Sequence, residues 1–361
     1  MKRVLFVAMH RPKRSPGQRF RFEQYIPYLE QHGYTCDISY IISESQDKII
    51  YSRGHYPEKL LIFANSVLTR MKDVVAARRY DIVFIYREAL MINSGLVEAL
   101  LASSGARAIL DFDDAIWLQG VSNENVRLAW LRRGPSKVPG ILRRMDTVFA
   151  GNEYLAAYAR RFNPSVHVVP TTLDTDTHAP RTTRPHAGVC IGWSGSPSTA
   201  PYFDALAPVL AQVKRTFGDG VYFKVMGDAD YRRPELGIIG RPWREDTEVE
   251  DTAELDIGLM PLPDDAWSRG KCGFKALLYM SLAIPPVVSP VGVNTTIVED
   301  GVNGYLAADE QEWIAAIGRL VTNPELRTKI GRRGRETVVE RYSLQSQRDR
   351  YVALFDELVG G

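Results

Sequence analysis

The sequence has few cysteines and no long apolar run, and these absences exclude several classes of protein. Its three cysteines, Cys36, Cys190 and Cys272, are too few and too far apart for a disulfide framework or a zinc site. We therefore expect a reducing, cytoplasmic environment. No run reaches the ~18 apolar residues of a transmembrane helix. The apolar run near the N-terminus, Val4 to Met9, is too short for a signal peptide and suits a first buried strand.

The sequence also has little excess of one charge sign over the other, because its 361 residues carry a net charge of only +2. The charges are unevenly divided, with +6 in residues 1–180 and −4 in residues 181–361. A basic N-terminal half suits an acidic acceptor, such as a lipid pyrophosphate, or peripheral contact with the anionic inner face of a membrane. Chance asymmetry of the surface explains the division equally well. We expect no nucleic-acid partner.

Two catalytic patterns are missing. GxxxxGK[ST] is absent, so the chain has no P-loop, and no pair of carboxylates stands out as the couple of a glycosidase. A chain of 361 residues is long for one core and suits two domains. Each half alternates short apolar runs with helical spacings, which is typical of doubly wound parallel sheets. The predicted class is therefore α/β, with two Rossmann-like domains.

The most informative stretch is residues 269–306, RGKCGFKALLYMSLAIPPVVSPVGVNTTIVEDGVNGYL. Its spacing predicts a loop, a helix that begins near Phe274, and a short buried strand after two prolines. The first N–H groups of a helix are unpaired and carry partial positive charge. Lys271 and Lys275 stand on either side of this helix start, so we predict a site for a phosphate or diphosphate. The alternative is that both lysines are only solvated.

The pattern GKxxFKxxxYMxxxIPxVxSxVGxNxxIVxDGxNGxL in this stretch resembles the donor-binding core of glycosyltransferase family 4, whose members have the two-domain GT-B fold. The resemblance covers most of the chain. It implies a retaining transferase, independent of metals and cofactors, that moves a sugar from a nucleoside diphosphate-sugar to a glycan or lipid-linked acceptor. The setting that it implies is the synthesis of cell-surface polysaccharide or glycoconjugate.

The resemblance also assigns roles within the stretch, and it fails at two positions. Lys271 would act in catalysis by stabilising the charge of the leaving diphosphate, and Lys275 would bind the donor. The family usually has two glutamates, eight positions apart, that contact the donor sugar and the ribose. Gly270 and Leu278 occupy these positions here. The chain therefore lacks both glutamates, and a catalytically impaired scaffold that binds nucleotide sugar or glycan is an alternative.

Two further segments of the C-terminal half are candidates for donor binding. After the predicted strand 189–193, Gly195 lets a ligand approach the backbone and Ser196 offers a hydroxyl, although a helix cap explains this loop equally well. Family members pack the loop after the next strand on the nucleobase. Arg241 or Trp243 would stack there, unless Trp243 belongs to the core.

The N-terminal half is expected to hold the acceptor. Gln18, Arg19 and Arg21 follow the first predicted strand, and Arg87 follows another. Ligands bind at the carboxyl ends of strands in open α/β sheets, so we predict that these four residues contact the acceptor or a phosphate. A solvated basic loop is the alternative.

The segment DFDD, residues 111–114, ends another predicted strand. By alignment of strand ends, Asp113 takes the place of a family histidine near the transferred sugar, so the resemblance implies a catalytic role for it. The alternative is that it caps the following helix. Asp111 and Asp113 also form the Asp-x-Asp pattern with which the unrelated GT-A enzymes bind a divalent metal. Two oxygen ligands alone are little support for a metal. We expect none, and a metal-dependent transferase remains the alternative.

The expected domain organisation is that of GT-B. Residues 1–172 form the acceptor domain, 173–187 a linker rich in threonine and proline, and 188–340 the nucleotide-sugar domain. Residues 341–361 form a helix that crosses back to the first domain. The resemblance implies that the two domains face a central cleft.

Overall fold

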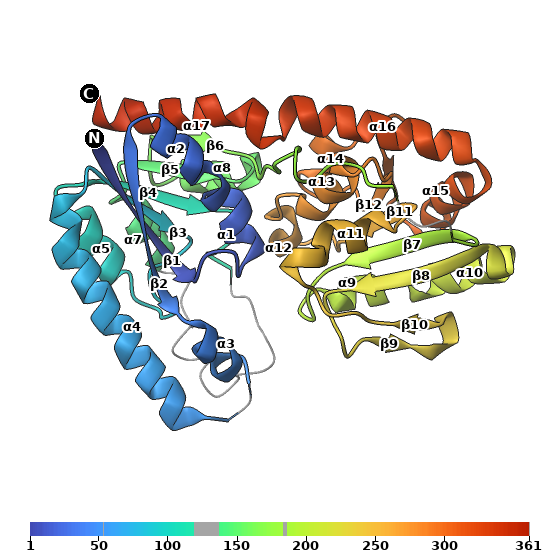
Figure 1. Ribbon diagram of the computed structural model, residues 1–361, viewed down its shortest axis with the longest axis horizontal. Helices are drawn as coiled ribbons and strands as arrows, with labels where there is room; N and C mark the ends of the chain where they lie inside the picture. The colour runs from blue at the N-terminus through green and yellow to red at the C-terminus, as the bar shows by residue number, and fades with distance from the viewer. Residues whose placement is uncertain (53, 119–136, 183–185, 361) are drawn as a thin grey trace. The chain divides into compact units, whose positions relative to one another are not determined.

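The structure, a computed structural model, describes residues 1–52, 54–118, 137–182 and 186–360 (Figure 1). The chain divides into two compact units. The first domain comprises Met1–Thr171 and Arg348–Gly361, and the second comprises Thr172–Gln347. Each domain is built on a parallel sheet with helices on its faces, so the predicted α/β class is confirmed.

The first domain has a parallel sheet of six strands in the order β2-β1-β3-β4-β5-β6. The strands are β1 (Lys2–His10), β2 (Tyr34–Ile42), β3 (Ile82–Tyr86), β4 (Arg107–Phe112), β5 (Thr147–Ala150) and β6 (Val166–Val168). β3 is buried along its whole length, because helices cover both faces of the sheet and leave it no polar side. The strand order reverses between β1 and β3, which is where a doubly wound sheet binds ligands.

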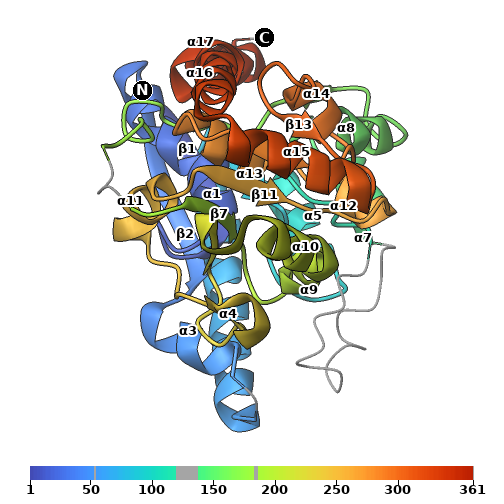
Figure 2. The ribbon, with the colours of Figure 1, turned by 90° about the vertical axis from the view of Figure 1, so that its right-hand side faces the viewer.

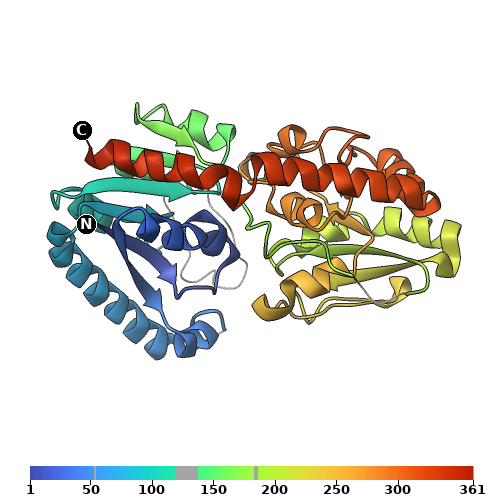
Figure 3. The ribbon, with the colours of Figure 1, turned by 45° about the horizontal axis from the view of Figure 1, so that its top comes forward.

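Helices flank this sheet on both faces. They are α1 (Pro16–Arg21), α2 (Ile26–Gln31), α3 (Glu44–Ile50), α4 (Tyr56–Ala76), α5 (Leu96–Ala102), α7 (Lys137–Leu142), α8 (Glu153–Ala159) and α17 (Leu344–Val359), with 3₁₀ turns η1 (Glu23–Tyr25) and η2 (Ala77–Arg79). Figure 3 shows α4 and α17 on opposite sides of the strands. On the α17 side, Phe355 lies 6.4 Å from Phe6 and 6.1 Å from both Phe84 and Phe149, measured between ring centroids. This aromatic cluster is the centre of the first core.

The second domain has a parallel sheet of five strands in the order β13-β12-β11-β7-β8, and a small antiparallel ribbon of β9 and β10. The strands are β7 (Val189–Ser194), β8 (Val221–Met226), β9 (Arg232–Arg233), β10 (Ile238–Ile239), β11 (Ile257–Met260), β12 (Pro286–Val288) and β13 (Tyr305–Leu306). The order reverses between β7 and β11, so the carboxyl ends of these two strands mark the expected ligand position.

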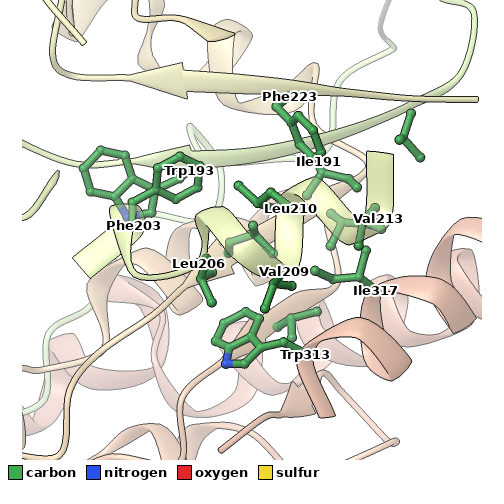
Figure 4. Packing of buried hydrophobic residues seen from close by; sticks show 14 of the residues in the cluster. Ile191, Trp193, Phe203, Leu206, Val209, Leu210, Val213, Phe223, Trp313 and Ile317 are labelled. Carbon is green, nitrogen blue, oxygen red and sulfur yellow. The ribbon is translucent and has the colours of Figure 1, made fainter. Parts of the chain in front are cut away.

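The helices of the second domain are α9 (Ala200–Asp204), α10 (Ala207–Phe217), α11 (Glu248–Ala253), α12 (Ala266–Arg269), α13 (Phe274–Ser281), α14 (Asn294–Ile297), α15 (Glu310–Thr322) and α16 (Pro324–Arg341), with 3₁₀ turns η4 (Gly218–Gly220), η5 (Pro234–Leu236) and η6 (Glu245–Thr247). Figure 2 shows α10 and α13 with strands of the sheet between them. Trp313 and Ile317 of α15 share one buried cluster with Val209 and Val213 of α10 (Figure 4). α13 packs instead against α16.

Residues 172–182 are part of the second domain, whereas the sequence predicted a linker over 173–187. Leu173 is fully buried, and its N–H donates to the carbonyl of Tyr342 at 3.0 Å. The Arg335 guanidinium donates to the carbonyls of Thr175 at 2.9 Å and His178 at 2.8 Å. These backbone partners order a segment that has little apolar surface of its own. The chain leaves the second domain within α17, after Gln347.

None of the helices in the described part of the chain has the length and the hydropathy needed to cross a membrane.

Candidate functional site

In the second domain, the loops after β7 and β8 approach each other backbone to backbone. The N–H of Gly195 donates to the carbonyl of Met226 at 2.8 Å. A Cβ on Gly227 would lie 1.9 Å from the carbonyl oxygen of Gly195, and Gly227 has a φ of +108°. A Cβ on Gly195 would lie 2.1 Å from the indole of Trp193. Neither position therefore has room for a side chain, and the two glycines allow the loops after β7 and β8 to pack closely against each other.

The hydroxyls of the loop after β7 bond within the loop. Ser196 Oγ lies 2.8 Å from Ser198 Oγ, and Thr199 Oγ1 donates to the carbonyl of Ser196 at 3.0 Å. Ser196 is exposed. The following helix, α9, has only five residues. What this loop offers a ligand is thus its small residues and an exposed hydroxyl, rather than the N-terminus of a long helix.

The start of α13 lies close to this loop. Gly273 precedes the helix at φ +71°, and a Cβ there would lie 2.3 Å from Ile297. On the first turn, Lys275 Nζ lies 5.7 Å from the centre of the Trp193 ring, the same indole that excludes a side chain from Gly195. Cation–π contact stabilises a lysine in this position. The structure thus brings Lys275 and Gly195, which were predicted separately, to one place at the end of β7.

Lys271 contacts a different aromatic ring. Its Nζ lies 4.7 Å from the centre of the Trp267 ring, in α12. Gly270 is the C-cap of α12 and is buried, with its N–H donating to the carbonyl of Trp267 at 3.0 Å. A second lysine is therefore present just before α13, at the end of a short helix.

Leu278 lies in the core of the second domain, so the assignment of this position to donor binding is wrong. Its side chain is fully buried, like those of Leu277 and Tyr279. α13 packs on β11 and β12 on one side and on α16 on the other, so most of its circumference is enclosed. A ligand has no access to position 278 from solvent, and the ribose contact of the family does not transfer to it.

Tyr279 connects the two strands at the point where the strand order reverses. Its hydroxyl accepts from the N–H of Ser194 at 3.0 Å and donates to the carbonyl of Leu259 at 3.3 Å. Burial raises the pKa of this phenol well above its usual value, so it stays a donor at neutral pH. Tyr279 thereby fixes the spacing of β7 and β11 beneath the candidate site.

Arg241 and Trp243 lie beside the end of β8. The N–H of Arg241 donates to Val225 O at 3.0 Å, and its carbonyl accepts from Gly227 N at 2.8 Å. The Arg241 side chain is 57% exposed. Trp243 Nε1 donates to Glu248 at 3.0 Å. A cavity of about 10 Å³ is lined by Ser194, Met226, Pro242, Trp243, Arg244, Glu248, Asp251 and Thr252.

A much larger cavity, about 610 Å³, lies at the opposite edge of the same sheet. Asp256 and Pro285, which line it, precede β11 and β12 in the chain. The amino ends of parallel strands do not bind the ligands of doubly wound folds. We therefore locate the candidate site by the loops and lysines at the carboxyl edge rather than by cavity size.

In the first domain, two of the four residues predicted to bind the acceptor are buried in the fold. Arg21 is 1% exposed and forms two bonds to Asp111, one of them 3.0 Å long, and one to the carbonyl of Val169. Gln18 is fully buried and donates to His10 O at 2.9 Å and to Glu23 at 2.6 Å. For Arg21 and Gln18 the prediction is wrong, because these side chains anchor α1 to the sheet. Arg19 remains half-buried, with its guanidinium 4.8 Å from the Phe20 ring.

Arg87 and Asp113 form the centre of the candidate site in this domain. Arg87 Nε donates to Asp113 Oδ1 at 2.7 Å, and Nη2 lies 2.7 Å from Asp114 Oδ2. Tyr86 donates to Asp113 at 3.0 Å. Arg87 has a φ of +60°, a strained conformation for this residue type that is often found at functional sites. A Cβ on Gly17 would lie 2.2 Å from the Tyr86 hydroxyl, so the loop after β1 closes on this group.

All three carboxylates of DFDD are paired with arginines. Burial raises the pKa of Asp113, but the Arg87 charge and hydrogen bond outweigh it, so the pKa is lowered overall. Burial raises the pKa of Asp111 to about 6, although Arg21 opposes the shift. A divalent cation would have to displace a guanidinium from either site. The chemistry of these carboxylates therefore favours positioning hydroxyl groups over holding a metal.

Sequence reasoning missed a polar group at the end of β1. His10 Nε2 lies 3.2 Å from the Tyr51 hydroxyl, and Nδ1 lies 3.9 Å from Asp47. Asp47 accepts from Arg11 at 2.6 Å and from Arg14 at 2.5 Å. Burial lowers the pKa of His10 to about 4, with the nearby arginines adding to the shift. The available signal was a histidine at the last position of a buried strand, followed by the basic loop.

Part of the chain is similar in sequence to known glycosyltransferases. Residues 198–323 match the family model described as glycosyl transferases group 1, a segment that runs from the loop after β7 to the end of α15. A lipopolysaccharide core biosynthesis glycosyltransferase, LpsE of Rhizobium meliloti, is 28% identical over 156 residues. This match covers 37% of the present chain and 42% of LpsE, so it spans less than half of that relative.

The similarity to solved structures extends over the whole chain. Sucrose-phosphate synthase from Thermosynechococcus elongatus has a TM-score of 0.68 at 15% identity, with full coverage of both chains. HepE of Anabaena, in complex with UDP and glucose, has a TM-score of 0.68 at 13% identity, with 99% of this chain and 100% of that chain covered. At such identities the likeness establishes the fold alone. The chain has the GT-B fold, with two Rossmann-like domains.

Proposed function

We propose that the chain is a retaining glycosyltransferase that moves a sugar from a nucleoside diphosphate-sugar to a glycan or lipid-linked acceptor, in the synthesis of cell-surface polysaccharide or glycoconjugate. One observation carries the proposal. The segment that matches the group 1 glycosyltransferases, residues 198–323, contains the start of α13, where Lys275 lies against Trp193 beside Gly195.

The physical task of this site is to stabilise a leaving diphosphate, whose charge grows as the glycosidic bond breaks. Lys275 and Lys271 supply positive charge, and the first N–H groups of α13 supply donors. Preorganised charge of this kind often contributes more to rate enhancement than any other single effect. Retention of configuration requires no protein nucleophile if the acceptor hydroxyl attacks from the side that the diphosphate leaves. UDP-glucose is the first donor to test, since HepE has been crystallised with UDP and glucose.

In the first domain, we assign the acceptor to the group around Arg87 and Asp113. Asp113 accepts hydrogen bonds from Arg87 and Tyr86, and a lowered pKa keeps it ionised at neutral pH. An ionised carboxylate held in this way orients a sugar or acceptor hydroxyl. We propose that the reaction needs no metal, because the carboxylates of DFDD are already compensated by arginines.

A second candidate is a scaffold that binds nucleotide sugar or glycan without transferring it. The observation in its favour is that the two positions which the resemblance gives to the family glutamates hold other residues. Gly270 has no side chain, and Leu278 is in the core. A scaffold that binds nucleotide sugar shares nucleotide binding with the transferase, and only the transferase predicts turnover.

The test is a thermal-shift screen against nucleoside diphosphates and their sugars, followed by an assay for nucleoside diphosphate release. A ligand at 100 times its Kd should stabilise its domain by about 2.7 kcal/mol. A shift with release in the presence of acceptor supports the transferase, and a shift without release supports the scaffold. Activity should survive EDTA. Loss on chelation with recovery in manganese or magnesium would return DFDD to the role of a metal site.

A further inference from the structure

Helix α4 has its polar side toward the protein and its apolar side toward the outside. Its buried positions are Ile62, Ser66, Arg70 and Asp73. Their spacing of three and four residues places them on one face of the helix. Only one of the four is apolar, so this helix does not follow the usual rule that the apolar stripe faces the core.

Arg70 is what holds α4 on the sheet. Its guanidinium is fully buried and donates to Asp73 at 2.7 Å and to Ser39 Oγ at 3.0 Å. It also donates to the carbonyl of Ala89 at 2.9 Å and to that of Ala8. α4 is thereby bonded to β1, to β2 and to the loop after β3. The apolar side of the helix contributes little to this attachment.

Helices α4 and α5 together expose eight large apolar side chains. They are Tyr56, Leu60, Leu61, Phe63, Leu68 and Val75 on α4, and Leu96 and Leu100 on α5. Leu61, Leu68 and Val75 are 64%, 59% and 75% exposed and follow one another at intervals of seven residues, so they form a line along the helix. α5 packs beside α4, and Figure 1 shows both on the outside of the first domain. We call this set of residues the α4 face.

Basic residues flank the α4 face. Lys72 follows Leu68 by four residues, a spacing that places it one turn further along α4 on the same side, and Arg79 lies in the 3₁₀ turn η2 that directly follows α4. Both are exposed. Apart from the buried Arg70–Asp73 pair, residues 56–80 contain four cations and one anion: Lys59, Lys72, Arg78, Arg79 and Glu58. The face is thus apolar along its centre and positive beside it.

We propose that the α4 face is a docking surface for an anionic lipid bilayer. Helices with leucine and phenylalanine on one side and lysine or arginine beside them lie in the plane of the membrane, with the apolar side chains among the upper acyl chains. Anionic headgroups attract the flanking cations over about one Debye length. Large exposed apolar patches mark interaction sites in other proteins.

Charge complementarity favours lipid over a second copy of the chain. Two α4 faces packed together would join two surfaces of the same sign, because Lys72, Arg78 and Arg79 of each copy are offset within residues 56–80 by Glu58 alone, apart from the buried Arg70–Asp73 pair. Anionic headgroups offer the opposite sign along the whole helix. A neutral or acidic protein partner is the remaining occupant, and vesicle binding by the purified chain separates it from lipid.

The proposal rests on α4 and α5 and does not depend on the proposed transferase activity. If both hold, the α4 face brings the acceptor-binding domain to a membrane, which suits a lipid-linked acceptor. Because vesicle binding needs neither donor nor acceptor, failure of one proposal leaves the other standing.

The experiment is co-sedimentation of the full chain with vesicles. Vesicles of equal parts phosphatidylglycerol and phosphatidylcholine are compared with vesicles of phosphatidylcholine alone, at low and high salt. The protein should bind the anionic vesicles and bind less at high salt. The triple variant Leu61→Gln, Leu68→Gln, Val75→Gln should bind at least about tenfold more weakly. The double variant Lys72→Glu, Arg79→Glu should lose the salt-dependent part of the affinity.

Matched controls come from the second domain. Ile239→Gln with Val302→Gln removes exposed apolar residues, and Arg319→Glu with Lys329→Glu reverses exposed charges. Both should bind vesicles like the unchanged chain. Melting temperature and UDP binding of each variant report folding, and the charge variant tests the proposal alone if the triple variant does not fold.

Three results would overturn the proposal. The first is that anionic vesicles do not deplete the unchanged chain from solution, and the second is that the two α4 variants bind as well as it does. The third is a concentration-dependent dimer, seen by light scattering without lipid, that the triple variant abolishes. That outcome would assign the α4 face to a second copy of the chain.

Discussion

Lys275 is the residue whose replacement most directly tests the proposed donor site. Its ammonium lies over Trp193 at the end of β7, where a diphosphate would meet the loop that contains Gly195. Replacing Lys275 by Ala should weaken UDP binding by about 1.5–3 kcal/mol, the value of a charge-assisted hydrogen bond. Isothermal calorimetry measures the affinity. Lys329→Ala, an exposed lysine of α16, is the control, and equal affinity of both variants would remove Lys275 from the donor site.

His10 gives a residue-scale prediction about pH. Burial lowers its pKa from 6.5 to about 4, so between these values the unfolded chain binds a proton that the folded chain does not. Stability should therefore fall as the pH drops from about 6.5 to about 4, by about 3 kcal/mol in full.

The measurement is the loss of melting temperature between pH 7 and pH 5. His10→Gln should lose less than the unchanged chain, whereas His32→Gln, an exposed histidine, should behave like it. An equal loss in all three proteins would mean that His10 titrates normally.

The residues that sequence reasoning placed wrongly share one physical cause. Arg21 and Leu278 were assigned from their positions in a motif, without knowledge of what covers them. Arg21 is enclosed because Asp111 and the carbonyl of Val169 lie beside it, and both belong to segments far away in the chain. Partners of this kind have no local signature. The place of Lys275 on the first turn of α13 could be predicted, because a helix start and a flanking lysine are local features.

At the scale of one element, α13 is nearly enclosed, and Leu278→Glu tests this. The buried carboxylate would have no partner, which costs several kcal/mol, so the melting temperature should fall sharply. Leu278→Met is the control, because a swap of similar volume should cost less than ~1.5 kcal/mol. A folded glutamate variant with tighter UDP binding would mean instead that the helix turns this position toward the ribose.

α4 is the element whose attachment depends on polar bonds, and Arg70→Met tests that dependence. The change leaves the Asp73 carboxylate buried without its cation and removes the group that donates to two backbone carbonyls. We therefore expect the free energy of unfolding to fall by about 3–5 kcal/mol. Urea unfolding, monitored by a spectroscopic signal from the first domain, measures this loss of stability.

Two companion variants control for this result. Arg70→Met combined with Asp73→Leu should recover part of the loss, because no charge remains unpaired. Lys72→Met, two residues away and exposed, should change stability by no more than ~0.5 kcal/mol. An equal effect of the single and double variants would show that the Arg70–Asp73 pair is not what holds α4.

Strands were easier to predict than helices in this chain. β3 and β11 are continuous apolar runs, each directly preceded by an aspartate, and continuous apolar runs are typical of strands covered on both faces. The orientation of α4 could not be predicted, because a search for an apolar stripe would turn its leucines inward. Arg70 instead faces the sheet and bonds to β1, to β2 and to the loop after β3. These three partners are far apart in the sequence and come together only in the folded sheet.

On the scale of the whole molecule, alternating strands and helices predicted two Rossmann-like domains, and the family resemblance implied the GT-B organisation. The first domain was predicted to end at residue 172 and ends at Thr171, whereas the predicted linker is largely part of the second domain. Residues 173–187 have the composition of a linker. Yet the Arg335 guanidinium donates to the carbonyl of Thr175, and the carbonyl of Tyr342 accepts from the N–H of Leu173. Composition reports how much apolar surface a segment can bury. It does not report hydrogen bonds from a helix 160 residues away.

The C-terminal helix gives the prediction that tests this organisation. α17 begins in the second domain, and from Arg348 onward it belongs to the first, where Phe355 is fully buried among aromatic rings. Phe355→Ala should cost the first domain about 3–5 kcal/mol, as the loss of a large buried side chain does. If nucleotide binding belongs to the second domain, UDP affinity should stay within about twofold, because the candidate donor site is built from β7, β8 and α13 of that domain.

Differential scanning calorimetry with and without UDP separates the two effects. The variant should lower the transition of the first domain, and UDP should raise the transition of the second domain equally in both proteins. Glu357→Ala, exposed on the same helix, is the control and should leave both transitions unchanged. If Phe355→Ala weakens UDP binding by much more than about twofold, the nucleotide site depends on the first domain. Its assignment to the second domain alone would then be wrong.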